Sequence, residues 1–176
     1  MAEARQWTAA RFEGVQATAH AEKGPRVYVT EPFFSFIYDG KPSAELLKTW
    51  ELKRASRQLS DRRTERRLTY TDPKTGLVLR CVGIEWKDFP TVEWTLYFKN
   101  EGSENTPILE NIQALNLMVN RTTTDEYILH HFDGGGGAPS AYRPNQSVLT
   151  TGEQETFSGL NGRPTGRSMS YFGHWG

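Results

Sequence analysis

A stretch of alternating residues near the middle of the chain constrains the fold most strongly. Within Thr91–Lys99, every second residue is a large apolar one, namely Val92, Trp94, Leu96 and Phe98. Side chains on a β-strand point to opposite faces in turn, so this pattern places one face on a core and the other in water. The segment therefore predicts a half-buried β-strand.

Turn sequences around this segment predict antiparallel hairpins. The preceding run, Leu77–Trp86, is largely apolar on both parities, which is typical of a strand covered on both sides. A short polar connection, residues 87–90, joins the two. Further upstream, Arg62–Thr71 also alternates, and residues 72–76 form an Asp-Pro-Lys-Thr-Gly turn, in which proline presets φ and glycine accepts positive φ. We expect the three strands to pair in sequence order.

Two segments fit both a helix and a strand. Leu47–Leu59 is interpreted as a strand because Trp50 and Leu52 share one parity and the flanking segments are strands, although residues 44–48 alone favour a helix. Pro107–Arg121 has apolar residues at both helical and strand spacings. The β context favours a strand there, with a possible bulge midway.

The predicted elements define an all-β fold. Phe33–Tyr38 adds an aromatic-rich strand that ends in a turn at residues 39–42. Strands at this turn spacing predict an antiparallel two-layer β-sandwich. We expect residues 1–25 to form an N-terminal extension or a first edge strand, and residues 26–176 to form one sandwich domain.

Composition argues against two classes of partner. Twenty-one basic residues balance 21 acidic ones, so no global field attracts nucleic acid or an acidic membrane surface. The arginines between residues 54 and 67 are interspersed with Glu51, Asp61 and Glu65, which is typical of a solvated face with local ion pairs. No stretch reaches transmembrane length, and residues 1–18 lack the apolar core of a signal peptide. This favours a cytoplasmic location, while a removed signal would leave a secreted or periplasmic one open.

Neither a disulfide nor a metal site is expected. Cys81 is the single cysteine and lies in an apolar run, which predicts a buried, inert thiol. His130 and His131 precede Asp133, but adjacent residues on a strand point to opposite faces and cannot both bind one ion without a kink. The glycine run that follows lacks the phosphate-loop pattern, and no cofactor is predicted.

Three ordered segments resemble α-galactosidases (melibiases) of glycoside hydrolase family 36. They are Phe34–Ser43, Asp88–Trp94, and Gly162–Thr165 followed by Tyr171-Phe172, and the resemblance spans roughly residues 26–172. It implies an N-terminal β-supersandwich that precedes a (β/α)₈ barrel. In that family both catalytic aspartates lie in the barrel, and no position here matches their motifs. The resemblance therefore implies no catalytic residue in this chain, which we expect to be cut before the barrel.

The function implied by the resemblance is that of an accessory, non-catalytic domain. It would support hydrolysis of α-galactosides by a downstream barrel. The alternative is a stand-alone carbohydrate-binding or protein-interaction β-sandwich. Expected partners are an α-galactoside or other carbohydrate, the barrel, and a second copy of the chain through apolar surface that a barrel would otherwise cover. Whether the segment alone is an enzyme stays open, because its carboxylates are scattered.

Three residues are candidates for carbohydrate contact: Trp86, Asp88 and Trp175. An aromatic ring packs against the C–H face of a pyranose, and a neighbouring carboxylate accepts hydroxyl protons. Trp86 and Asp88 lie in one turn, whereas Trp175 lies near a glycine-flanked end. In the alternative interpretation, Trp86 belongs to the core and Asp88 caps the turn.

Overall fold

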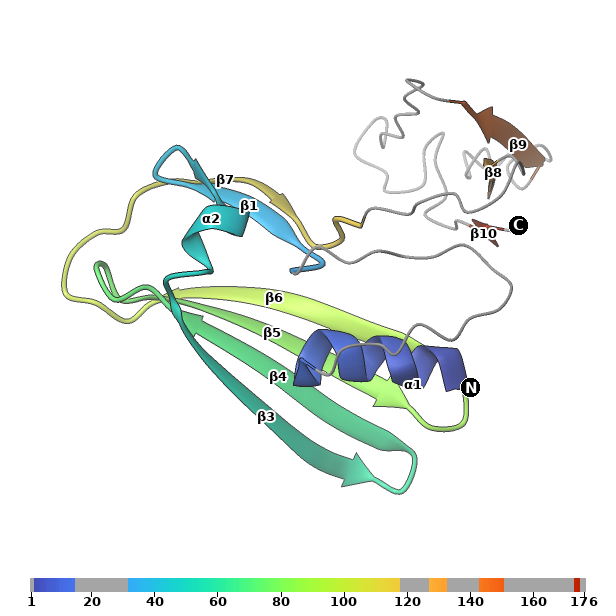
Figure 1. Ribbon diagram of the computed structural model, residues 1–176, viewed down its shortest axis with the longest axis horizontal. Coiled ribbons are helices and arrows are strands. Elements are labelled where there is room, and N and C mark those ends of the chain that lie inside the picture. Colours follow the sequence, from blue (N-terminus) through green and yellow to red (C-terminus); the bar gives the residue numbers. More distant parts are fainter. Residues whose placement is uncertain (1, 15–31, 118–126, 133–142, 151–172, 175–176) are drawn as a thin grey trace. The chain divides into compact units, whose positions relative to one another are not determined.

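The computed structural model describes residues 2–14, 32–117, 127–132, 143–150 and 173–174 (Figure 1). Strands predominate, and every strand pair in these ranges is antiparallel. The chain divides into two compact units, residues 1–20 with 28–118 and residues 21–27 with 119–176. The predicted all-β sandwich is confirmed, whereas the boundary after residue 25 stays a prediction.

The largest sheet consists of the predicted consecutive hairpins. Its strands β3 (Glu51–Ser60), β4 (Arg63–Thr71), β5 (Leu77–Trp86) and β6 (Val92–Asn100) lie in sequence order (Figure 1). In the register of the β4–β5 and β5–β6 pairings, Leu68, Cys81 and Leu96 lie side by side. This row faces the core, because Leu68 and Cys81 are buried.

A smaller sheet has the order β2 (Lys41–Pro42), β1 (Ser35–Tyr38) and β7 (Leu109–Gln113). The pairing of β1 with β7 shifts between Ser35 and Ile37, so β7 carries one extra residue. Asn111 absorbs it with a φ of 47°, a left-handed conformation that asparagine tolerates. The bulge predicted for this segment is confirmed, but the predicted strand is wrong at residues 107–108 and 114–117, and its part beyond residue 117 lies outside the described residues.

The strand predicted from Leu47 begins later than expected. A short helix, α2 (Ser43–Leu46), and a turn at residues 47–49 come before β3. The Phe36 N–H donates to the Ser43 hydroxyl at 3.2 Å, which fixes the helix start against β1. The helix-favouring composition of residues 44–48 therefore outweighs the strand context, and the predicted strand is wrong over its first residues.

The N-terminal residues are helical. An α-helix, α1 (Ala2–Thr8), continues into a π-helical turn, η1 (Ala9–Glu13), which ends at Gly14 with a φ of 73°. The edge strand considered for residues 1–25 is therefore wrong over residues 2–13, where alanine, glutamate, arginine and glutamine are good helix formers. No helix in the described ranges has the length and apolar character needed to cross a membrane.

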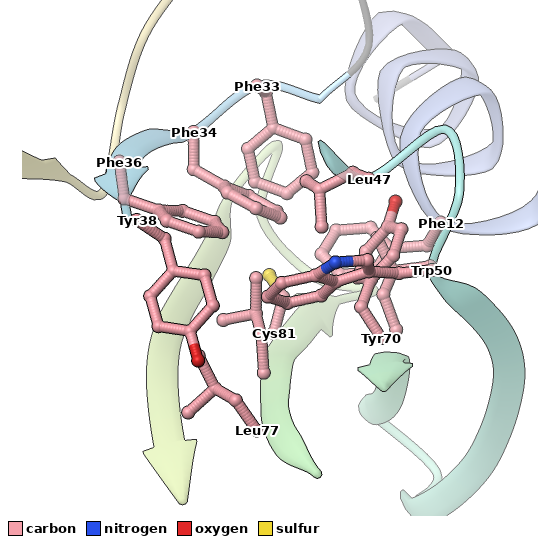
Figure 2. Packing of buried hydrophobic residues seen from close by; sticks show 12 residues of the cluster. Phe12, Phe33, Phe34, Phe36, Tyr38, Leu47, Trp50, Tyr70, Leu77 and Cys81 are labelled. Atoms are coloured by element: carbon pink, nitrogen blue, oxygen red, sulfur yellow. The ribbon is translucent and has the colours of Figure 1, made fainter. Parts of the chain in front are cut away.

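Aromatic side chains fill the space between the two sheets and the helical segment (Figure 2). Phe36 of β1 meets Phe98 of β6 edge to face at 5.3 Å between ring centroids, and Tyr38 meets Trp50 at 5.9 Å. Edge-to-face pairs add to the free energy of burial. The buried members of the core are Phe12, Phe33, Phe34, Phe36, Tyr38, Leu47, Trp50, Leu68, Tyr70, Leu77, Leu79 and Cys81.

The second unit contains a three-stranded antiparallel sheet of its own. Its strands are β8 (Tyr127–Phe132), β9 (Pro144–Leu149) and β10 (Gly173–His174), in the order β10-β8-β9. In the β8–β9 pairing, His130 lies opposite Gln146 and His131 opposite Asn145.

Candidate functional site

The two described residues of the predicted carbohydrate site lie at the turn between β5 and β6. Trp86 is partly buried, and the guanidinium carbon of Arg63 lies 5.3 Å from its ring centroid. Asp88 is exposed and pairs with Arg62, with 3.3 Å between Oδ2 and Nε. The Lys87 N–H donates to the Arg62 carbonyl at 2.8 Å, which joins this turn to the β3–β4 turn.

Both side chains therefore have an arginine partner that a sugar would have to displace or share. Their role in carbohydrate contact stays a prediction. Trp175, the third candidate, lies outside the described residues.

A second group of charged side chains lies on the core-facing side of the large sheet. Arg66 of β4 has only 17% of its side chain exposed, and Glu85 of β5 has 10%. The Arg66 Nη2 and Nε atoms lie 2.8 and 2.9 Å from Glu85 Oε2, and Nη1 pairs with Glu13. This arginine was expected on a solvated face, and for Arg66 that expectation is wrong. The reason is its register position, opposite Gly83 on the inner face.

The helical segment brings Glu13 to this cluster. Phe12, the preceding residue, packs against Gly83, where an added Cβ would lie 2.5 Å from the Phe12 Cζ. Near the end of α1, the Trp7 ring lies 5.5 Å from the ring of Trp94. The absence of a side chain at Gly83 thus allows the helical segment to dock closely, and the ion pair from Glu13 to Arg66 then forms beside it.

A pocket of about 240 Å³ opens next to the Arg66 ion pairs. We call it the Arg66 pocket, and its lining residues are Phe12, Glu13, Arg54, Ala55, Ser56 and Arg66. Arg54 passes close to Gly14, where a Cβ would lie 3.3 Å from Nη2. Guanidinium, carboxylate and hydroxyl groups therefore meet beside one apolar ring, within a single compact unit.

The cluster does not have the geometry of a glycoside-hydrolysing pair. A retaining glycosidase needs two carboxyl groups about 5 Å apart across the bond to be cleaved. Here Glu13 and Glu85 flank the Arg66 guanidinium, which fills the space where a glycosidic oxygen would lie.

Other reactive groups among the described residues have structural surroundings. Cys81 is fully buried, which confirms the predicted buried thiol, and desolvation raises its pKa to about 12. The Ser147 hydroxyl lies 3.3 Å from His131 Nε2 between β8 and β9. Within the described ranges, no three His, Cys, Asp or Glu side chains lie close enough together to hold a metal ion. Asp133 falls outside those ranges.

Sequence reasoning missed the Arg66 pocket, although one signal for it was present. Glu85 has the same parity as Leu79 and Cys81 in an apolar strand, so a buried carboxylate that needs a cationic partner was foreseeable. No such signal marked Glu13, because residues 1–25 were expected to form an extension or an edge strand.

Comparisons with known proteins add no relative. No protein-family model, no curated protein and no solved structure is found to match the chain. The fold and the pocket therefore define it only as an antiparallel β-sandwich with a charged pocket on its inner sheet face.

Proposed function

We propose that the chain is an accessory, non-catalytic N-terminal domain of an α-galactosidase-like glycoside hydrolase. It would support the hydrolysis of α-galactosides by a (β/α)₈ barrel. The observation that carries this proposal is a shared core. Phe34, from the first resembling segment, and Trp94, from the second, both pack on Phe33, with ring centroids 5.4 and 5.2 Å away. Two segments far apart in the sequence thus contribute to one core. This supports the interpretation that both segments belong to the same domain type.

Exposed apolar residues in β7 and beside its two ends supply a surface for the barrel. Ile108 has 74% of its surface exposed, Ile112 has 49% and Leu115 has 51%. Exposed apolar groups gathered along one short segment favour a covering partner. We place the barrel contact there, and without a barrel the same surface favours association with a second copy of the chain.

The test mixes the folded chain with a separately produced barrel domain of a family 36 α-galactosidase. Calorimetric titration measures association, and nitrophenyl α-galactoside turnover measures activity. We expect no turnover by the chain alone, and association with the barrel that Ile108→Lys weakens. Leu59→Lys is the matched control, because Leu59 is also an exposed apolar residue but lies at the end of β3.

Turnover by the chain alone would replace the accessory role with an enzymatic one. If the barrel does not associate with the folded chain, the proposal is wrong.

The alternative, a stand-alone carbohydrate-binding sandwich, has one specific observation in its favour. The Arg66 pocket combines hydrogen-bonding groups of both kinds with an apolar wall. A binding site of this kind is compatible with an accessory domain as well.

A further inference from the structure

We infer that the Arg66 pocket binds a neutral, polyhydroxylated small molecule the size of one sugar ring. The choice of a galactoside as the first probe rests on the proposed function. The pocket itself rests on separate observations, which are its charge balance, its hydrogen-bonding groups and its size.

The charges around the pocket cancel. Two guanidinium groups, from Arg54 and Arg66, face two carboxylates, from Glu13 and Glu85. An anionic ligand would have to compete with both carboxylates for Arg66 and would meet Glu13 beside Arg54, and a cationic ligand would meet both arginines. A pocket with this balance favours a ligand without net charge.

The hydrogen-bonding groups suit a ligand with several hydroxyls. Arg54 and Ser56 are two residues apart on β3, so both point to the same face of the sheet. The guanidinium donates, the serine hydroxyl donates and accepts, and a carboxylate oxygen of Glu13 accepts. Neighbouring hydroxyls on a sugar ring both donate and accept, so they match this mixture, and hydrogen bonds to charged groups are the stronger ones.

The size of the pocket matches a ligand of about one ring. The volume of about 240 Å³ lies below the range of about 300–1,000 Å³ typical of sites for drug-sized molecules. Phe12 closes the apolar side, and it is held there by Gly83 and by the ring of Phe33 at 5.4 Å. This wall of the pocket is therefore preformed by packing that does not depend on a ligand.

Isothermal titration of the whole chain tests the inference. The probes are D-galactose, methyl α-D-galactoside, D-glucose and D-mannose, with galacturonate and galactosamine as charged counterparts of galactose. We expect at least one neutral sugar to bind with a Kd of about 1 mM, and the charged counterparts to bind more weakly.

Two variants and one control locate the binding. Arg54→Ala should weaken it about tenfold, because a charged hydrogen-bond donor is lost. Ser56→Leu should abolish it by filling the pocket. Arg57→Ala removes another exposed arginine from the opposite face of the same strand, and it should leave binding unchanged. Both pocket variants change exposed residues, and thermal unfolding checks that they are folded.

Several results would overturn the inference: equal affinity in all four proteins, a preference for galacturonate, or no binding of any neutral sugar to the folded chain. The last result would leave the accessory role untouched, since that role depends on the barrel. Binding of mannose or glucose but not galactose, with dependence on Arg54, would support the pocket and count against galactosides as its ligand.

Discussion

At the scale of single residues, Gly83 shows how a missing side chain controls packing. An added Cβ would lie 2.5 Å from the Phe12 Cζ, and Phe12 cannot retreat freely because it also packs on Phe33. We predict that Gly83→Ala lowers the free energy of unfolding by about 1–3 kcal/mol, as overpacking does. Urea unfolding followed by fluorescence measures the change.

A double variant tests the cause. In a Phe12→Ala background the clash is absent, so Gly83→Ala should cost much less there. An equal cost in both backgrounds would show that the ring contact is not the source of the effect.

Cys81 provides a second prediction at this scale. Burial raises the pKa of its thiol from 9.0 to about 12, so neither access nor ionisation favours reaction. The thiol should stay unlabelled by Ellman's reagent at pH 8 in the folded protein and react fully in guanidinium chloride.

The same shift has a pH consequence. The folded pKa lies above the unfolded one, so the folded state keeps its proton while the unfolded state loses it between pH 9 and about 12. The free energy of unfolding should therefore fall as pH rises through this window, and Cys81→Ala should make the fall shallower. For the labelling test above, rapid reaction of the native protein with Ellman's reagent would contradict the burial of Cys81.

At the scale of elements, the ion pairs of Arg66 join η1 to two strands of the sheet. Arg66→Leu leaves the buried carboxylate of Glu85 without its cation, and we predict a loss of about 3–5 kcal/mol in the free energy of unfolding. Arg57→Ala removes an arginine whose side chain is 67% exposed, and its partner Glu65 keeps Arg67, so the change should cost less than about 1 kcal/mol. Chemical denaturation of both variants compares them directly, and similar losses would show that burial does not distinguish the two pairs.

The sequence predicts the elements where a local pattern decides them. Alternation of Val92, Trp94 and Leu96 predicts β6, and the turn residues 72–76 predict the β4–β5 hairpin. Local sequence patterns do not predict an element whose structure depends on contacts with residues far away in the sequence. The helical segment at residues 2–13 is fixed by Phe12 on Gly83 and by Trp7 on Trp94, and neither partner is near it in sequence.

The candidate site is harder to predict for the same reason. The residues of the Arg66 pocket come from η1, β3 and β4, and its buried carboxylate comes from β5. Their proximity follows from strand register and from the docking of the helical segment, so no short motif encodes it. Only Glu85, a charge on a buried parity, could be noticed in advance.

At the scale of the whole molecule, the chain consists of two compact units. Units with contacts mainly within themselves unfold separately when the interface between them is small. We predict two transitions in differential scanning calorimetry. Arg66→Leu should lower the temperature of only one, because Arg66, Glu13 and Glu85 belong to the same unit.

A single transition, with equal calorimetric and van't Hoff enthalpies, would contradict independent unfolding. A lowered temperature for both transitions in Arg66→Leu would show that the units stabilise each other.

Strand β3 forms one edge of the four-stranded sheet, and its residues are exposed except for the partly covered Leu52. An open edge of this length could template the growth of fibrils by adding strands from other chains. Lys53, Arg54 and Arg57 place cationic groups along both faces of this edge, so a second β3 would bring like charges together. The cationic residues of β3 therefore disfavour the pairing of this edge with the same strand of another copy.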